Sequence, residues 1–141
     1  MTAGVEAGDG LAWIEAQLQA DAQWVAACLG GVHLGMAPQG TTAPVCALWV
    51  QSAPEYLTAF GVRIWTTPTI MVKHSGPSDS FTAVRSCAAR AYAVLDHHVG
   101  ATQGALIKSC ILGNQFPLPE PKLVNGVQWL SYVQLYDLIV Q

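Results

Sequence analysis

Two segments of the chain carry apolar residues at the three- and four-residue spacing of an amphipathic helix. The first begins near Asp9, a suitable N-cap, and ends at Gly30 and Gly31; its apolar positions are Leu11, Ile14, Leu18, Val25 and Leu29. Asp21 is a suitable start for a second helical piece within it. The other segment runs from about Asp79 to His98, with an apolar stripe at Phe81, Val84, Ala88, Ala91 and Leu95. We expect this second helix to cover one face of a sheet.

Runs rich in β-branched, aromatic and other apolar residues predict the strands. They cover Val32–Met36, Val45–Gln51, Val62–Lys73, Ala105–Leu112 and Val127–Val140. Pro68 indicates an edge position, a bulge or a break in the third run. Ser52–Gly61 is predicted to be an aromatic-bearing loop that joins two antiparallel strands. Gly113–Gly126, which holds three prolines, is predicted to be a long irregular connection.

This order of elements predicts an α+β fold, with a mainly antiparallel β-sheet of four to five strands packed by two helices. We expect a single domain over residues 10–141 and a flexible N-terminal arm over residues 1–9, which are rich in small residues. The longest apolar stretches, Val25–Leu29 and Leu138–Val140, are far shorter than the roughly 20 residues of a membrane span. Met1–Gly10 lacks the basic residues of a secretory signal, which predicts synthesis in the cytoplasm without membrane contact.

The composition changes what the surface is expected to do. The 141 residues are 52% hydrophobic and only 11% charged, whereas soluble domains usually carry about a quarter charged residues. The chain also contains five tryptophans, more than one sheet and two helices can hide completely. We therefore expect part of the surface to contact other protein, as in the subunit of an assembly.

The charge pattern argues against nucleic-acid recognition. The net charge is -3, and the six basic residues are scattered without forming a run. Sequence-specific binding to nucleic acid is therefore not expected. Cys28, Cys46, Cys87 and Cys110 are widely spaced in apolar settings, so we expect buried reduced thiols in place of disulfides or a zinc site.

No motif for catalysis is complete in this sequence. Asp96, His97 and His98 resemble the signature of DHH-type phosphoesterases, but the further carboxylates that two-metal chemistry needs form no second motif. The histidines at this helix end are expected to be structural. His33 and His74 stand alone, and no phosphate-binding glycine pattern is present. We expect no enzyme activity, no catalytic or metal-binding residues and no cofactor.

The order of elements and several local phrases resemble the tail terminator or tail completion proteins of long-tailed phages. The phrases are Leu29-Gly30-Gly31, Val32-His33-Leu34, the linker from Ala37 to Pro44, Ser78-Asp79-Ser80-Phe81, Gly104-Ala105-Leu106 and Pro119-Glu120-Pro121. The resemblance extends from about Gly10 to Val140. Pro68 and the strongly apolar final strand depart from the usual pattern.

The resemblance implies a structural virion protein at the head-proximal end of a tail. Such proteins form a ring, usually a hexamer, that caps the tail tube, stops its polymerisation and provides the surface for head attachment. The implied partners are copies of the chain itself, the tail tube protein and head-tail connector or neck proteins. DNA passes through the lumen of such a ring without sequence-specific contacts.

A head-to-tail ring needs two different contact surfaces on every subunit. The interface candidates are the aromatic and basic residues of the predicted loops and strands, namely Tyr56, Phe60, Trp49, Trp65, Arg63 and Phe116. One alternative is another neck or connector ring component. The alternative from a different class is a small-molecule-binding α+β enzyme with Asp96, His97 and His98 near a pocket.

Overall fold

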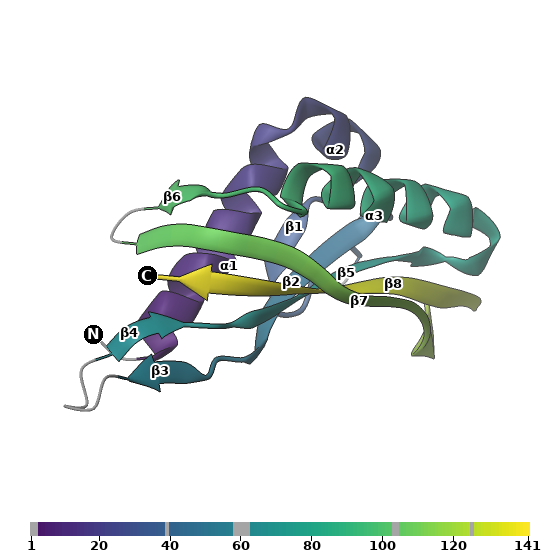
Figure 1. Ribbon diagram of the computed structural model, residues 1–141. Coiled ribbons are helices and arrows are strands. Elements are labelled where there is room, and N and C mark those ends of the chain that lie inside the picture. Colours follow the sequence, from purple (N-terminus) through teal and green to yellow (C-terminus); the bar gives the residue numbers. More distant parts are fainter. Residues whose placement is uncertain (1–2, 39, 58–62, 103–104, 125) are drawn as a thin grey trace.

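The computed structural model describes residues 3–38, 40–57, 63–102, 105–124 and 126–141. Its helices are α1 (Ala3–Ala20), α2 (Ala22–Ala27), the 3-10 turn η1 (Ser78–Ser80) and α3 (Phe81–Leu95). Its strands are β1 (Val32–Leu34), β2 (Val45–Ser52), β3 (Glu55–Leu57), β4 (Arg63–Thr66), β5 (Thr69–Pro77), β6 (Gly100–Thr102), β7 (Ala105–Val124) and β8 (Val127–Val140). The helices lie on one side of the sheet that these strands form (Figure 1).

The sheet is larger and more mixed than the four to five antiparallel strands expected. Across the described residues it contains eight strands, with the order β1-β2-β5-β8-β4-β3, with β7 paired to β8 and with β6 paired to β7. The pairing of β1 with β2 is parallel, and the other pairings are antiparallel. The α+β class and the single domain are confirmed, but the strand number was wrong. Three α-helices, not two, accompany the sheet because the first helical segment divides at Asp21, as its sequence indicated.

Two of the extra strands come from segments that sequence patterns divided wrongly. The predicted strand Val62–Lys73 is two strands, since β4 ends at Thr66 and β5 starts at Thr69, on either side of Pro68. This break is one of the three outcomes that proline allows in a strand. Part of the predicted loop Ser52–Gly61 is the strand β3, which pairs with β4.

The prediction of an irregular connection over Gly113–Gly126 was also wrong. β7 continues through Pro117 and Pro119, which lie opposite Tyr132 and Leu130 of β8. Proline has no backbone N–H group, and alternate residues of a strand direct their N–H groups toward the same edge. Both prolines therefore lack an N–H on the edge of β7 that faces away from β8, where no hydrogen bond to β8 is lost. β6 pairs only with Ala105–Ile107, so within the described structure this outer edge of β7 is unpaired and tolerates proline.

The core lies between the helices and one face of the sheet. Cys46 and Leu48 of β2, Val72 of β5 and Tyr136 of β8 are fully buried there. Trp13 of α1 and Trp24 of α2 pack into the same cluster, so these two tryptophans are core residues. The apolar stripe of α3 is confirmed, because Val84, Ala88, Ala91 and Leu95 are all buried.

The four cysteines are buried free thiols, as the sequence predicted. Burial raises the pKa of Cys110 to about 12, so this thiol stays protonated at neutral pH. The first helix starts at Ala3, six residues before the expected start at Asp9. Within the described residues, no helix is both long enough and apolar enough to span a membrane.

Candidate interaction site

The face of the sheet opposite the helices carries rows of side chains that cross four strands. Successive side chains of a strand point to opposite faces, so the neighbours of buried Cys46, Leu48 and Val72 lie on this open face. The registers align three rows there: Trp49, Met71, Leu135 and Asn114; Ala47, Lys73, Val133 and Phe116; and Val45, Ser75, Ser131 and Leu118. Most of these positions are apolar or small. Trp49, Met71 and Leu135 are half-buried, whereas the middle of the face is buried at Val45, Ala47, Ser75, Ser131 and Val133.

A groove of about 510 Å³ lies at the β2 side of this open face. Its apolar walls come from Met36 in the turn after β1, from Ala47 and Trp49 on β2, and from Trp129 on β8. Met36 is 90% exposed, which is unusual for a large apolar side chain. Lys73 and Glu120 are the charged residues of its lining. We call this hollow the open-face groove.

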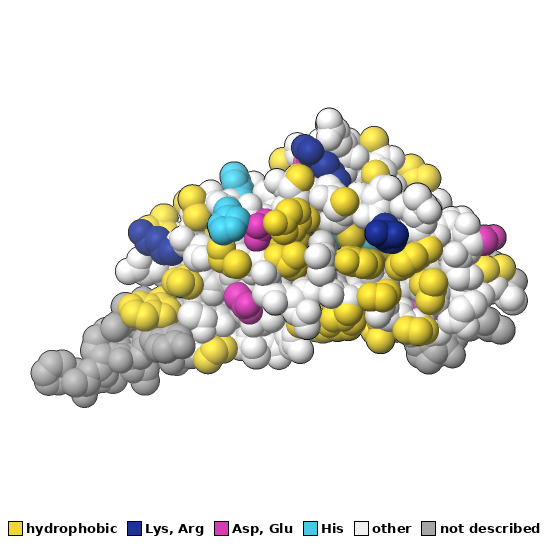
Figure 2. Space-filling model, turned by 45° about the vertical axis from the view of Figure 1, so that its right-hand side comes forward, with side chains coloured by type: hydrophobic (Ala, Val, Ile, Leu, Met, Phe, Trp, Pro, Cys, Tyr) yellow, Lys and Arg dark blue, Asp and Glu magenta, His cyan; other side chains and the backbone are white. Residues whose placement is uncertain are grey.

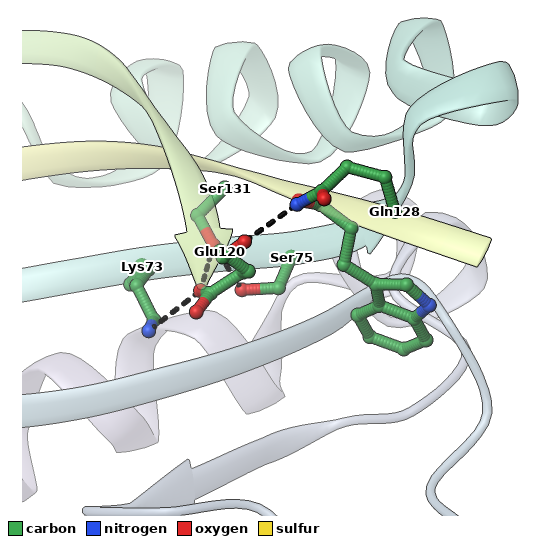
Figure 3. A network of polar contacts seen from close by, with 6 residues as sticks. Lys73, Ser75, Glu120, Gln128 and Ser131 are labelled. Atoms are coloured by element: carbon green, nitrogen blue, oxygen red, sulfur yellow. Dashed lines mark hydrogen bonds and ion pairs between the residues drawn. The ribbon is translucent and has the colours of Figure 1, made fainter. Parts of the chain in front are cut away.

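A polar network closes one side of the open-face groove (Figure 3). Lys73 donates to Oε1 of Glu120 at 2.8 Å, and its Nζ also lies 5.6 Å from the ring centre of Trp49. The hydroxyl of Ser131 donates to the same Glu120 oxygen, and the hydroxyls of Ser75 and Ser131 are 2.7 Å apart. Gln128 donates to the backbone carbonyl of Glu120. This end of β7 is therefore held down on β5 and β8.

The electrostatics of Glu120 follow from these contacts. Partial burial raises the pKa of this carboxyl, but the hydrogen bonds from Lys73 and Ser131 and the charge of Lys73 outweigh that effect. Its pKa is consequently below the ordinary value, and Glu120 is ionised at neutral pH. A charged pair with satisfied hydrogen bonds thus sits beside the aromatic walls, which suits contact with protein.

Few charges interrupt the apolar surface elsewhere. In Figure 2 the hydrophobic side chains form several groups, and the charged side chains between them are single and far apart. Leu34 and Met36, at the β1 edge of the sheet, are 55% and 90% exposed. On the other side of the sheet, Leu106 of β7, which lies beside β6, and Ile111 of β7 are 46% and 37% exposed. Both sides of the sheet therefore present apolar side chains.

The structure distributes the predicted interface candidates over separate places. Trp49 lines the open-face groove, and Phe116 lies half-buried in the row of Lys73. Trp65 is half-buried on β4, where it borders a separate hollow with Ile139. Tyr56 on β3 and Arg63 on β4 belong to the β3–β4 pair, and Phe60 lies outside the described residues.

Sequence reasoning missed four residues of the groove, namely Met36, Lys73, Glu120 and Trp129. Lys73 and Glu120 are 47 residues apart, and neither carries a local motif. The signal available for Lys73 was the alternation of half-buried and buried positions along β5.

The Asp96-His97-His98 triplet has structural contacts in the folded chain. Oδ1 of Asp96 accepts a hydrogen bond at 2.8 Å from the backbone of Leu112, and Oδ2 lies 3.4 Å from Nε2 of His97. His98 stacks on Trp13 with ring centres 5.6 Å apart. His97, the second residue after α3, adopts a positive φ of 62°. In the described part of the chain, no group of three or more His, Cys, Asp or Glu has a geometry that could hold a metal ion.

Comparison with known proteins finds a chain of similar fold but no protein of similar sequence. No protein-family model matches the chain, and no curated protein matches its sequence. A chain in the solved structure of the virion of a native gene transfer agent (GTA) particle superimposes with a TM-score of 0.80. The match covers 96% of both chains at 15% sequence identity. The two chains therefore share one fold over nearly their whole length.

Proposed function

We propose that this protein is a structural virion protein, and more specifically a ring-forming tail terminator. In this role it caps the tail tube, stops its polymerisation and provides the surface to which a head attaches. The observation that carries the proposal is the fold match, over 96% of both chains, to a component of a gene transfer agent virion. The resemblance of the sequence to tail terminators supports the same role.

The distribution of apolar surface supports a head-to-tail ring. Such a ring joins two unlike surfaces of neighbouring copies, so each subunit needs two contact patches. Leu34 and Met36, exposed at the β1 edge, are the candidates for one contact patch, and Leu106 and Ile111, exposed on β7, are the candidates for the other. β2, β5 and β8 lie between β1 and β7, so the two candidate patches are on opposite sides of the sheet. Because Met36 also lines the open-face groove, a neighbouring copy bound at the β1 edge would cover part of that groove as well.

The proposal is tested by measuring what the purified chain assembles into. Its mass in solution is measured by light scattering, alone and after mixing with the tail tube protein encoded in the same genome. We expect rings, and in electron micrographs we expect them at one end of tubes of limited length. Monomers alone, both with and without tubes, would overturn the proposal. Rings that do not bind the tail tube but do bind a head connector protein would indicate a neck component instead.

A further inference from the structure

A second pocket, of about 350 Å³, lies between α3 and the β7–β8 hairpin on the helix-covered side of the sheet. Arg85 and Tyr92 reach it from α3, Gln115 from β7, and Tyr132 and Gln134 from β8. We call it the α3 pocket. In contrast to the open-face groove, its lining is rich in groups that form hydrogen bonds.

Gln134 provides the α3 pocket with an unpaired acceptor. The side chain is 1% exposed, and its Nε2 donates to the backbone carbonyl of Ala88 at 3.1 Å. Nε2 also lies 3.4 Å from Oε1 of Gln115, so the orientation of the amide is fixed by two acceptors. Oε1 of Gln134 has no hydrogen-bond partner among the described residues. Buried polar atoms are nearly always paired, so this oxygen calls for a donor from outside.

Arg85 provides the pocket with an unpaired cation. Arg90, on the same helix, forms a two-nitrogen ion pair with Asp21, with Nε–Oδ2 at 2.7 Å and Nη2–Oδ1 at 3.0 Å. Arg85 is exposed and has no ion-pair partner in the described part of the chain. A guanidinium group matches a carboxylate with two parallel hydrogen bonds. Arg85 is therefore available to pair with a carboxylate that enters the α3 pocket.

We propose that the α3 pocket binds an aspartate or glutamate residue in an exposed segment of a protein partner. The carboxylate pairs with the guanidinium of Arg85, and a backbone N–H of the same segment donates to Oε1 of Gln134. The rings of Tyr92 and Tyr132 pack against the peptide groups on either side. A carboxylate and an amide donor close together are the property of an acidic residue within a chain. The inference does not depend on ring formation, because the pocket belongs to a single subunit.

The test uses the full chain, labelled with nitrogen-15, and a small probe that carries both groups. N-acetyl-aspartate methylamide is titrated into the protein while the side-chain amide signals of Gln134 and the Nε–H signal of Arg85 are followed by NMR. We expect saturable shifts of both signals at millimolar probe. The uncharged N-acetyl-asparagine methylamide is the matched probe, and it should bind at least about tenfold more weakly.

Arg85→Ala should weaken binding of the acidic probe at least about tenfold, because the exposed side chain is removed without disturbing the core. Lys108→Ala, which removes an exposed cation on β7 outside the pocket, should leave binding unchanged. The proposal is overturned if neither signal shifts, if both probes bind equally, or if Arg85→Ala binds like the parent. Because the readout is local to one subunit, a chain that fails to form rings can still pass this test.

Discussion

The indole nitrogen of Trp24 donates a hydrogen bond to Nε2 of His74 at 3.0 Å in the buried core. Nε2 can accept only while it carries no proton, so His74 is neutral in the folded chain. Burial lowers the pKa of His74 to about 3. Its Nδ1 has no partner among the described residues. Protonation of His74 would therefore break this contact between α2 and β5.

Acid should therefore destabilise the protein through His74. The unfolded chain binds a proton below about pH 6.5, while the folded chain resists it until about pH 3. The free energy of unfolding should fall with decreasing pH across this window, by up to about 1.4 kcal/mol per pH unit from this group. Denaturant unfolding between pH 7 and pH 4 measures the slope.

The variant His74→Leu should reduce this acid slope and cost about 1–3 kcal/mol at neutral pH, because it leaves the Trp24 N–H unpaired. His97→Gln is the control, since the side chain of His97 is 75% exposed. Equal pH slopes for His74→Leu and the parent would contradict the assignment.

Gly30→Ala should destabilise the fold by about 3 kcal/mol or prevent folding. A Cβ at this position would overlap the backbone carbonyl of Thr42 and lie 2.9 Å from Cβ of Val45. Backbone atoms cannot rotate away as a side chain does. Gly8→Ala is the matched control, because nothing lies within 4 Å of its Cβ, and in a helix it should gain about 0.5–1 kcal/mol. Thermal unfolding of both variants distinguishes these effects.

Arg90→Gln should lower the thermal unfolding temperature, because it removes the ion pair that joins α3 to Asp21 at the start of α2. The hydrogen bond from Arg90 lowers the pKa of Asp21, so this contribution is present near neutral pH and is lost as acid protonates the carboxylate. Arg85→Gln is the control on the same helix and should have little effect on the unfolding temperature. If both variants unfold alike, the pair contributes nothing measurable.

Glu120→Gln should loosen the far end of β7 at a cost of about 0.5–1 kcal/mol, because it weakens a partly buried ion pair with Lys73. Amide hydrogen exchange should become faster in residues 117–124 and stay unchanged in β5. A matched change, Glu15→Gln on α1, should leave exchange in β7 unaltered. Unaltered exchange in Glu120→Gln would show that strand pairing alone holds this end.

The head-to-tail arrangement makes a prediction about mixtures. Met36→Glu and Ile111→Glu each place a charge in one of the two edge patches, so neither variant alone should assemble. Mixed together, each supplies the intact patch that the other lacks, and the pair should form a dimer that cannot grow. Ala93→Glu, on the exposed side of α3, should assemble like the parent. Light scattering and gel filtration measure these masses, and rings from either edge variant alone would refute the assignment of the patches.

The spacing of hydrophobic residues predicted the helices and strands that bury one face. It failed for the part of β7 whose outer edge is unpaired in the described structure, because an unpaired strand edge tolerates proline. The stripe from Phe81 to Leu95 was readable because only one side of α3 contacts the sheet. The β7 segment after Gly113 was not readable, because proline normally indicates a break and its tolerance depends on which edge is free. That edge is a property of the assembled sheet, and local sequence does not contain it.

The groove was less predictable than the fold because its residues meet only through strand pairing. Trp49 was identified as a contact residue from its type alone. Lys73 and Glu120 come together because β5, β8 and β7 are neighbours in that order. A one-residue change of register would put Lys73 among the core residues, so the pair depends on the register of two strand pairings at once.

The position of β8 in the sheet bears on how the chain is made. β8 pairs with β4, β5 and β7, yet it follows all of them in the sequence. While the ribosome is still synthesising the segment before residue 127, one side of β5 and the long inner edge of β7 have no partner. Such edges bind other chains readily. We therefore expect crowded translation to favour aggregation, and the late arrival of the central strand to end that period of exposure.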